Sequence, residues 1–277
     1  MTQLVIKEEF MDYEKKAKEI RADILKMLFA CQSGHPGGSL SCVEMLMALY
    51  YDTMKGLDPK NPKNPDRDRF VLSKGHACPT LYAILADLGY FPKEDLQNLR
   101  QLHCHLQGHP DCKKTPGVDV NTGSLGQGAS ISIGLALGAK LKKASWQTYT
   151  VLGDGECQEG LVWEAAMAAS HYKLDNLTWM LDYNHLQIDG SNDEVMSLGD
   201  INAKFKAFGF EVYDVADGNN IQEIEKALQA PHNGKPKFIC CHTVKGKGVD
   251  FMENQFQWHG SPMNKEQFEK ALAQQEV

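Results

Sequence analysis

Long apolar runs are absent from this sequence of 277 residues. No stretch approaches the roughly 20 consecutive apolar residues that a membrane-spanning helix requires. The N-terminal segment Met1–Glu9 lacks the basic region and the cleavage site of a secretory signal. We therefore expect a protein of the cytoplasm that does not act in or on a membrane.

An excess of positive charge is absent as well. The chain carries 29 Lys and Arg against 36 Asp and Glu, which gives a formal net charge of −7. Proteins that bind nucleic acids through phosphate contacts carry a basic surface, so we expect no nucleic-acid partner. If the ligand is a phosphate, the cationic side chains must be concentrated around it.

Cys-x-x-Cys motifs are also missing, although the chain contains eight cysteines. Without a secretory signal, these are expected to be free thiols rather than a disulfide framework. The neighbours Cys240 and Cys241 lie in an apolar segment and are expected to be small buried side chains. One group of histidines and cysteines could be a zinc site: His103, Cys104, His105, His109 and Cys112. Its spacing fits no common pattern of paired zinc ligands. We therefore favour histidines of a loop, one of which faces a substrate.

The composition that is present fits a large α/β domain. Apolar residues make up 42% and charged residues 23% of the chain, as in ordinary globular proteins that bury a full core. Apolar strand-like segments alternate with segments of helical periodicity, which predicts a parallel sheet flanked by helices. The predicted strands are 69–73, 148–152, 177–181, 210–215 and 238–243. The predicted helices are 14–31, 79–88, 128–142, 159–171, 221–230 and 265–275.

Two further segments carry local predictions. His35–Gly38 is predicted to form a turn, and Ser41 with Glu44 three residues later predicts a capping box that begins the next helix. The segment 102–121 has little periodicity, and loops of this length in compact domains are usually functional or disordered.

The most informative motif is Gly153-Asp154-Gly155, which follows one predicted strand, while Asn184 follows the next. The helix between them makes this a βαβ unit, so both side chains lie at the carboxyl ends of neighbouring parallel strands, where ligands bind. A carboxylate and a carboxamide, with room for waters and phosphate oxygens, suit Mg²⁺. The glycines let a diphosphate approach the backbone near a helix N-terminus. A helix-capping Asp and a turn-forming Asn are the alternative.

These features resemble the thiamine diphosphate (ThDP) enzymes, whose signature is Gly-Asp-Gly followed about thirty residues later by Asn. The chain resembles the transketolase family most closely, with matching segments in family order from about residue 10 to residue 262. The resemblance implies the diphosphate-binding domain of the ThDP-binding fold, as a single domain over residues 1–277. The matching segments are 34–38 (Gly-His-Pro-Gly-Gly), 73–77, 108–110, 122–128, 153–160, 187–190, 245–248 and 258–260 (Trp-His-Gly).

The resemblance also implies roles for individual residues. Mg²⁺, or Ca²⁺ or Mn²⁺ in its place, would be held by Asp154, Asn184 and the backbone carbonyl of Leu186. The sugar would contact the catalytic histidines His35, His109 and His259. The cofactor would contact His76, Gly123, Ser124, Leu125, Asp154, Gly155, Asn184, Lys245 and His259.

For four residues, among them Lys245, an alternative interpretation stays open. Glu159 and Glu164 would belong to an acidic network at the subunit interface, with an ordinary charged helix face as the alternative. Lys74 is a further pocket candidate, as is Lys245, and a solvated surface lysine is the alternative for each. The chain departs from the family pattern at Ser41 and at His185, and neither change removes a proposed ligand.

The resemblance covers only the N-terminal half of a transketolase. In that family the carboxylate that activates the cofactor comes from a second, pyrimidine-binding domain. We therefore expect a separate C-terminal subunit that supplies this domain and its glutamate in an α2β2 assembly. The expected reaction transfers a two-carbon ketol unit between sugar phosphates. Gly-His-Pro-Gly and Trp-His-Gly favour transketolase over an enzyme resembling deoxyxylulose-phosphate synthase, and a non-catalytic ThDP-binding paralogue is the other alternative.

Overall fold

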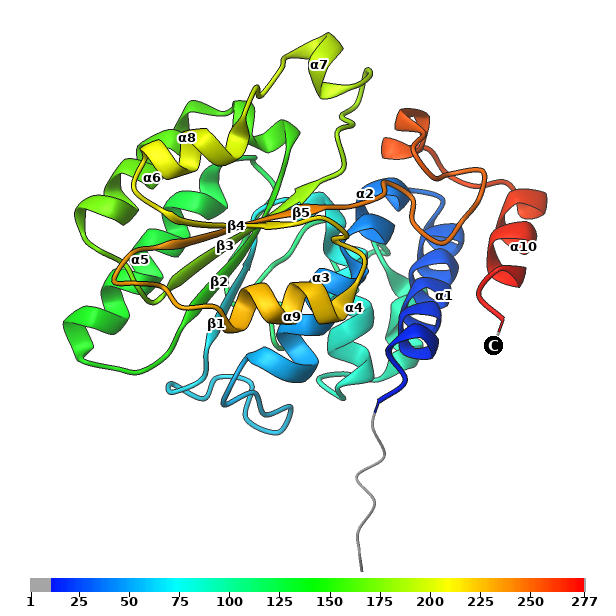
Figure 1. The fold of residues 1–277 in the computed structure, drawn as a ribbon. Helices are drawn as coiled ribbons and strands as arrows, with labels where there is room; N and C mark the ends of the chain where they lie inside the picture. The colour runs from blue at the N-terminus through cyan, green and yellow to red at the C-terminus, as the bar shows by residue number, and fades with distance from the viewer. Residues whose placement is uncertain (1–10, 277) are drawn as a thin grey trace, which may run out of the picture.

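The computed structural model describes residues 11–276, so the prediction about a secretory signal lies outside the described residues. A five-stranded sheet with the order β1-β2-β3-β5-β4 forms the centre, and every strand pair is parallel (Figure 1). The predicted fold class, a parallel sheet flanked by helices, is therefore confirmed. The strands are β1 (Arg69–Leu72), β2 (Thr148–Gly153), β3 (Leu177–Tyr183), β4 (Glu211–Val215) and β5 (Lys237–His242).

Helices cover both faces of the sheet, which explains why its inner strands read as continuous apolar runs. Alternate residues of a strand point to opposite faces, so Met180 joins the core under one helical layer and Trp179 joins the other. One layer contains α1 (Tyr13–Cys31), α3 (Val43–Met47), α4 (Cys78–Asp87) and α9 (Ile221–Gln229). The other contains α5 (Gln127–Lys142), α6 (Gly160–His171) and α8 (Ile201–Ala207).

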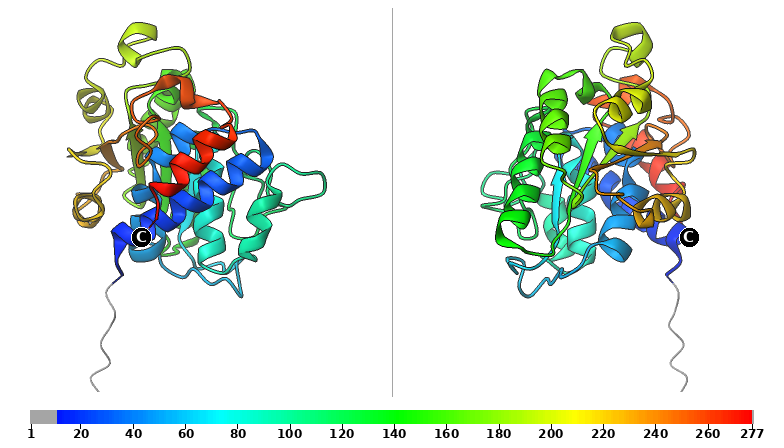
Figure 2. Two further views of the ribbon diagram at one scale, coloured as in Figure 1. Left: turned by 90° about the vertical axis from the view of Figure 1, so that its right-hand side faces the viewer. Right: turned by 60° about the vertical axis from the view of Figure 1, so that its left-hand side comes forward.

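Local capping and apolar periodicity explain the longest helix. The Asp12 side chain accepts a hydrogen bond from the Lys15 amide at the N-terminus of α1, which satisfies a donor that the helix leaves free. Ile20 and Ile24 are fully buried on its inner face. The C-terminal helix α10 (Lys265–Ala273) packs against α1 through Phe268, which stacks on Phe29 with ring centroids 4.2 Å apart, and Figure 2 shows the two helices side by side. No helix among residues 11–276 has the length and apolarity to cross a bilayer.

The capping-box prediction is wrong, and so is the turn at 35–38. Pro36 begins the short helix α2 (Pro36–Ser41), and Ser41 is its last residue. The Ser41 hydroxyl donates a 2.6 Å hydrogen bond to Asp182, while Glu44 forms a 2.8 Å ion pair with Arg21. Both side chains are buried, and these distant partners replace the local capping contact.

The irregular segment is confirmed, since residues 101–126 contain neither helix nor strand. One short helix, α7 (Asn192–Val195), interrupts the loop after β3. The 3-10 turns that carry site residues are η2 (Gly75–Ala77), η4 (Gly155–Gln158) and η5 (Phe256–His259).

Candidate active site

A cavity of about 350 Å³ lies where the carboxyl ends of the strands meet the loops that follow them. Of the predicted site residues, Ser124 and Glu164 do not line it; both are exposed. Segments far apart in sequence build this cavity, which is typical of ligand sites in parallel sheets. Its lining includes His35, His76, His109, Gly123, Leu125, Asp154, Gly155, Glu159, Asn184, Leu186, Lys245 and His259.

Four histidine rings converge in this cavity. The ring centroid of His35 lies 5.1 Å from that of His76, 5.3 Å from that of His259 and 6.5 Å from that of His109. His76 and His259 are 5.2 Å apart. They come from the start of α2, from η2, from the irregular segment and from η5, so only the folded chain brings them together.

These imidazoles are neutral near pH 7. Burial, helped by neighbouring cations, lowers the pKa of His35 to about 4 and that of His259 to about 3. The same causes lower the pKa values of His76 and His109. A neutral imidazole has one N–H donor and one acceptor nitrogen. The Nδ1 atom of His35 is buried and has no hydrogen-bond partner among the described residues.

Asp154 has one satisfied and one free carboxylate oxygen. Its Oδ1 accepts a 2.7 Å hydrogen bond from the Gly155 amide, and its buried Oδ2 has no partner among residues 11–276. Burial, together with nearby Asp182, raises the pKa of Asp154 to about 6. An unpaired buried carboxylate oxygen is costly, so this atom is suited to a cation.

The other two predicted metal ligands lie beside it in the cavity wall. The side-chain oxygen of Asn184 accepts a 3.2 Å hydrogen bond from the Leu186 amide. The Leu186 carbonyl accepts a 2.9 Å hydrogen bond from the Lys245 ammonium. Carboxylate, amide and carbonyl oxygens form a donor set of the kind that hard divalent cations bind, and the residues therefore fit a magnesium site.

Two lysines beside the site are buried, each 2% exposed. Lys74 forms an ion pair with Asp182 and donates a 2.8 Å hydrogen bond to the Gly38 carbonyl. Burial alone would raise the pKa of Asp182, but Lys74 holds it below its usual value. Burial lowers the pKa of Lys245 to about 8, and its Nζ lies 3.1 Å from Nδ1 of His259. Solvated surface lysine, the alternative for both residues, is wrong.

Glu156 is a structural residue that the sequence reasoning missed. Its carboxylate accepts hydrogen bonds from the Gly126 amide at 2.8 Å, from the Gly153 amide at 2.9 Å and from the Ser73 hydroxyl. The carboxylate thereby joins the ends of β1 and β2 to the start of α5. Only its position after Gly-Asp-Gly hinted at this role, because the Gly153 amide alone is local and the other two donors, Ser73 and Gly126, are tertiary contacts.

Two glycines keep the segment before α5 close to the site. Gly123 has φ +146° and Gly126 has φ +81°, values that favour glycine. A Cβ atom on Gly123 would lie 3.1 Å from the His109 ring, and one on Gly126 would lie 3.1 Å from Glu159. Leu125, which is 36% exposed, lines the cavity between them.

The histidines and cysteines of 103–112 do not form a metal site in the structure. His105 is hydrogen-bonded to Asp95 at 3.1 Å and packs edge-on against Phe91, whereas His109 faces the cavity. The three histidines lie in a loop, as predicted, and the role of one of them toward a substrate stays a prediction. All eight cysteines are free, as expected.

The fold and the cavity together define an α/β domain with a candidate ligand site at the carboxyl ends of its parallel strands. Comparison with known families narrows this class. The family model "Transketolase, thiamine diphosphate binding domain" matches residues 13–275. The chain belongs to this transketolase family.

The similar proteins are of two kinds: transketolase subunits that this chain covers almost in full, and longer transketolases of which it covers less than half. The chain is 41% identical over 261 residues to an apulose-4-phosphate transketolase subunit of Phocaeicola vulgatus, with 94% of this chain and 92% of that protein covered. It is 43% identical over 271 residues to 6-deoxy-6-sulfo-D-fructose transketolase subunit SqwG of a Clostridium species, with 97% and 98% covered. Among solved structures, the transketolase of Campylobacter jejuni has a TM-score of 0.87 at 36% identity, and the match covers 95% of this chain but 42% of that one.

Proposed function

We propose that this chain is the diphosphate-binding subunit of a split transketolase, in which residues 1–277 form a single domain. Together with a C-terminal subunit it would transfer a two-carbon ketol unit from a ketose phosphate to an aldose phosphate. The observation that carries this proposal is the convergence of four neutral imidazoles on a buried carboxylate with a free oxygen, in one cavity.

In this proposal Asp154, Asn184 and the Leu186 carbonyl hold Mg²⁺, or Ca²⁺ or Mn²⁺ in its place. The free Oδ2 of Asp154 supports the assignment. The Leu186 carbonyl would exchange the Lys245 ammonium for the ion, which leaves Lys245 to contact the diphosphate. When bound, ThDP supplies the carbon nucleophile that cleaves the bond next to a ketose carbonyl. The other residues assigned to it are His76, Gly123, Ser124, Leu125, Gly155 and His259.

The remaining chemistry is proton transfer at the sugar. We assign His35, His109 and His259 to the sugar's hydroxyl and carbonyl oxygens. Because their pKa values lie below 6.5, each ring donates one hydrogen bond and accepts another at neutral pH. The unpartnered Nδ1 of His35 supports a polar ligand at that position.

A separate partner subunit is proposed because this chain matches subunits of similar length but only part of longer transketolases. The two relatives named as subunits match over 92% and 98% of their length, while the chain spans 41% of the rat transketolase. The partner would supply the pyrimidine-binding domain and the activating glutamate in an α2β2 assembly. An exposed apolar residue one turn after Glu164 on α6, Met167 at 57%, supports an interface near Glu159 and Glu164. The eight free cysteines suit the reducing cytoplasm.

The experiment is co-expression with the product of the adjacent reading frame, followed by a ketol-transfer assay with ThDP and Mg²⁺. The purified complex is expected to be active and the chain alone inactive. His35→Ala and His109→Ala should each lower kcat/KM by about 10²-fold or more, the usual effect of losing an acid–base group. His103→Ala, at an exposed histidine of the same segment, is the matched control.

Two other outcomes would redirect the proposal. Turnover with pyruvate as donor, and none with a ketose phosphate, would indicate an enzyme like deoxyxylulose-phosphate synthase. Cofactor binding without turnover in the complex would indicate a non-catalytic paralogue. Activity of the chain alone would contradict the dependence on a partner.

A further inference from the structure

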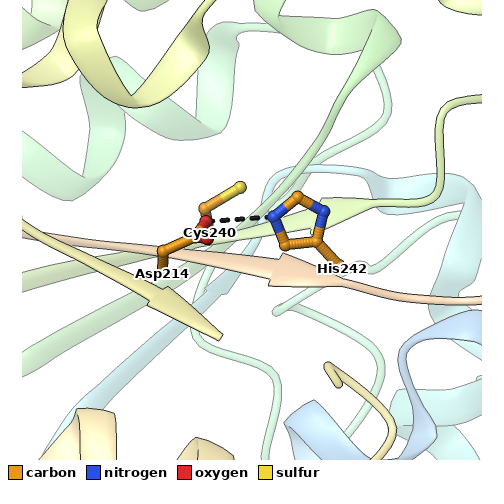
Figure 3. Close-up of side chains that lie close together, drawn as sticks. All are labelled: Asp214, Cys240 and His242. Atoms are coloured by element: carbon orange, nitrogen blue, oxygen red, sulfur yellow. Dashed lines mark hydrogen bonds and ion pairs between the residues drawn. The ribbon is translucent and has the colours of Figure 1, made fainter. Parts of the chain in front are cut away.

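A second cluster of metal-ligating side chains lies outside the active-site cavity. Asp214 of β4 and Cys240 and His242 of β5 each offer one ligand atom, and these three atoms lie within 4.8 Å of one another. Figure 3 shows them gathered at the two neighbouring strands. Among residues 11–276, this is the group of His, Cys, Asp and Glu side chains that meets this geometry.

The strand register explains why the three side chains meet. In the parallel pair of β4 and β5, Asp214 is the partner of Cys240. His242 follows Cys240 by two residues and therefore points to the same face of the sheet. The backbone of two hydrogen-bonded strands thus holds all three residues in place without a flexible loop.

The hydrogen bonds of the cluster fix its outer part. The Oδ1 atom of Asp214 lies 3.0 Å from Nε2 of His242 and accepts a 2.7 Å hydrogen bond from the Asn202 amide group. Asn202 lies on α8, so a helix of the covering layer orients the carboxylate. Such an oriented second partner is typical of metal ligands.

The exposure of the three residues forms a gradient from the core to solvent. Cys240 is fully buried, the His242 side chain is 34% exposed and the Asp214 side chain is 53% exposed. A buried thiol cannot reach a substrate, which argues against a Cys-His-Asp nucleophile. An ion, in contrast, can enter beside Asp214 and be bound from the inner side by sulfur.

We propose that Asp214, Cys240 and His242 form a binding site for Zn²⁺, with water as the fourth ligand. Thiolate, imidazole and carboxylate together favour zinc over magnesium. On binding, the Cys240 thiol releases its proton to solvent. Nε2 of His242, which faces the Asp214 carboxylate in the absence of the ion, gives up its proton as Nδ1 takes one from solvent, and Nε2 then binds the ion. The thiolate and the carboxylate neutralise the two charges of the ion.

The zinc site would join the ends of β4 and β5. It lies next to the loop after β3, which holds the proposed magnesium ligands Asn184 and Leu186. Tyr183 is the register partner of His242, and its ring contacts that of His185 at a tilt of 39°, with ring centroids 4.0 Å apart. His185 directly follows Asn184 in the chain. An ion that joins β4 to β5 would therefore stiffen the base of this loop. The zinc site does not depend on the proposed transketolase activity.

The test is titration of the full chain with Co²⁺ in the absence of ThDP. A cobalt thiolate absorbs in the near ultraviolet, a signature that an all-oxygen magnesium site does not give. We expect this band to appear, to vanish on addition of Zn²⁺, and to accompany release of about one proton per ion, because a thiol binds the ion only as the thiolate. Cys240→Ala should abolish the band.

Cys241→Ala is the matched control, since this equally buried thiol faces the opposite core. The band should persist in that variant. Asn202→Ala should weaken Co²⁺ binding by about 10–100-fold, the usual effect of removing a second partner. If Cys240→Ala does not fold, Asp214→Asn, at the exposed end of the site, replaces it as the test. This variant should weaken Co²⁺ binding at least as strongly as Asn202→Ala. Absence of the band, or a band that survives Cys240→Ala, would overturn the proposal.

Discussion

The carboxylate of Glu156 gives the sharpest test of how this site is held together. The buried side chain accepts hydrogen bonds from two backbone amides and one hydroxyl. In Glu156→Gln the shape is kept, but an amide nitrogen must replace one of the two oxygens. At least one of the amides, that of Gly126 or that of Gly153, would then face a donor instead of an acceptor.

The expected cost follows from these contacts. A hydrogen bond to a charged group contributes about 1.5–3 kcal/mol, and an unsatisfied buried donor costs about 1–3 kcal/mol. Burial also raises the pKa of Glu156, which means that its charged form carries a desolvation cost that the neutral amide avoids. We therefore expect a net loss of about 2–4 kcal/mol in the free energy of unfolding, or a fall of about 5 °C in Tm for a chain of this size.

Urea denaturation followed by circular dichroism measures this difference. Glu159→Gln is the matched control, because Glu159 is exposed three residues along the chain, and exposed substitutions change stability by only about 0.5 kcal/mol. If Glu156→Gln were as stable as this control, the carboxylate would not join the two strand ends to α5, and the reasoning would be refuted.

Three further predictions follow from named contacts. Because burial raises the pKa of Asp154 to about 6, protons compete with the ion below that pH, so Mg²⁺-dependent ThDP binding in calorimetry should weaken about fivefold between pH 6 and pH 5; a flat profile would count against Asp154 as a ligand. Phe205→Ala should lower the free energy of unfolding by about 3–5 kcal/mol, since Phe205 is fully buried and stacks 3.8 Å from Phe238; urea denaturation of the variant checks this. Gly126→Ala should cost about 1–3 kcal/mol in the same assay, because its φ of +81° strains any side chain; an unchanged midpoint would show that the turn relaxes.

Much of the fold is local information and could be predicted. Apolar runs and helical periodicity located the five strands to within a few residues, because burial on both faces of a parallel sheet demands such runs. The same argument placed Asp154 and Asn184 at neighbouring strand ends, and both line the cavity. The binding and catalytic roles of the site residues stay predictions that the experiments above test.

The sequence by itself therefore determined the element order, the parallel sheet and the edge of the sheet at which the polar residues gather. Only the tertiary structure decided which side chains pair across that edge. Lys74 meets Asp182 at a distance of 108 residues along the chain, and Ser41 meets the same carboxylate across 141 residues. Asp214 meets Cys240 only because β4 and β5 are neighbours in the sheet and pair in this register. Periodicity reports which face of an element is buried, but strand order and register depend on the packing of the whole chain.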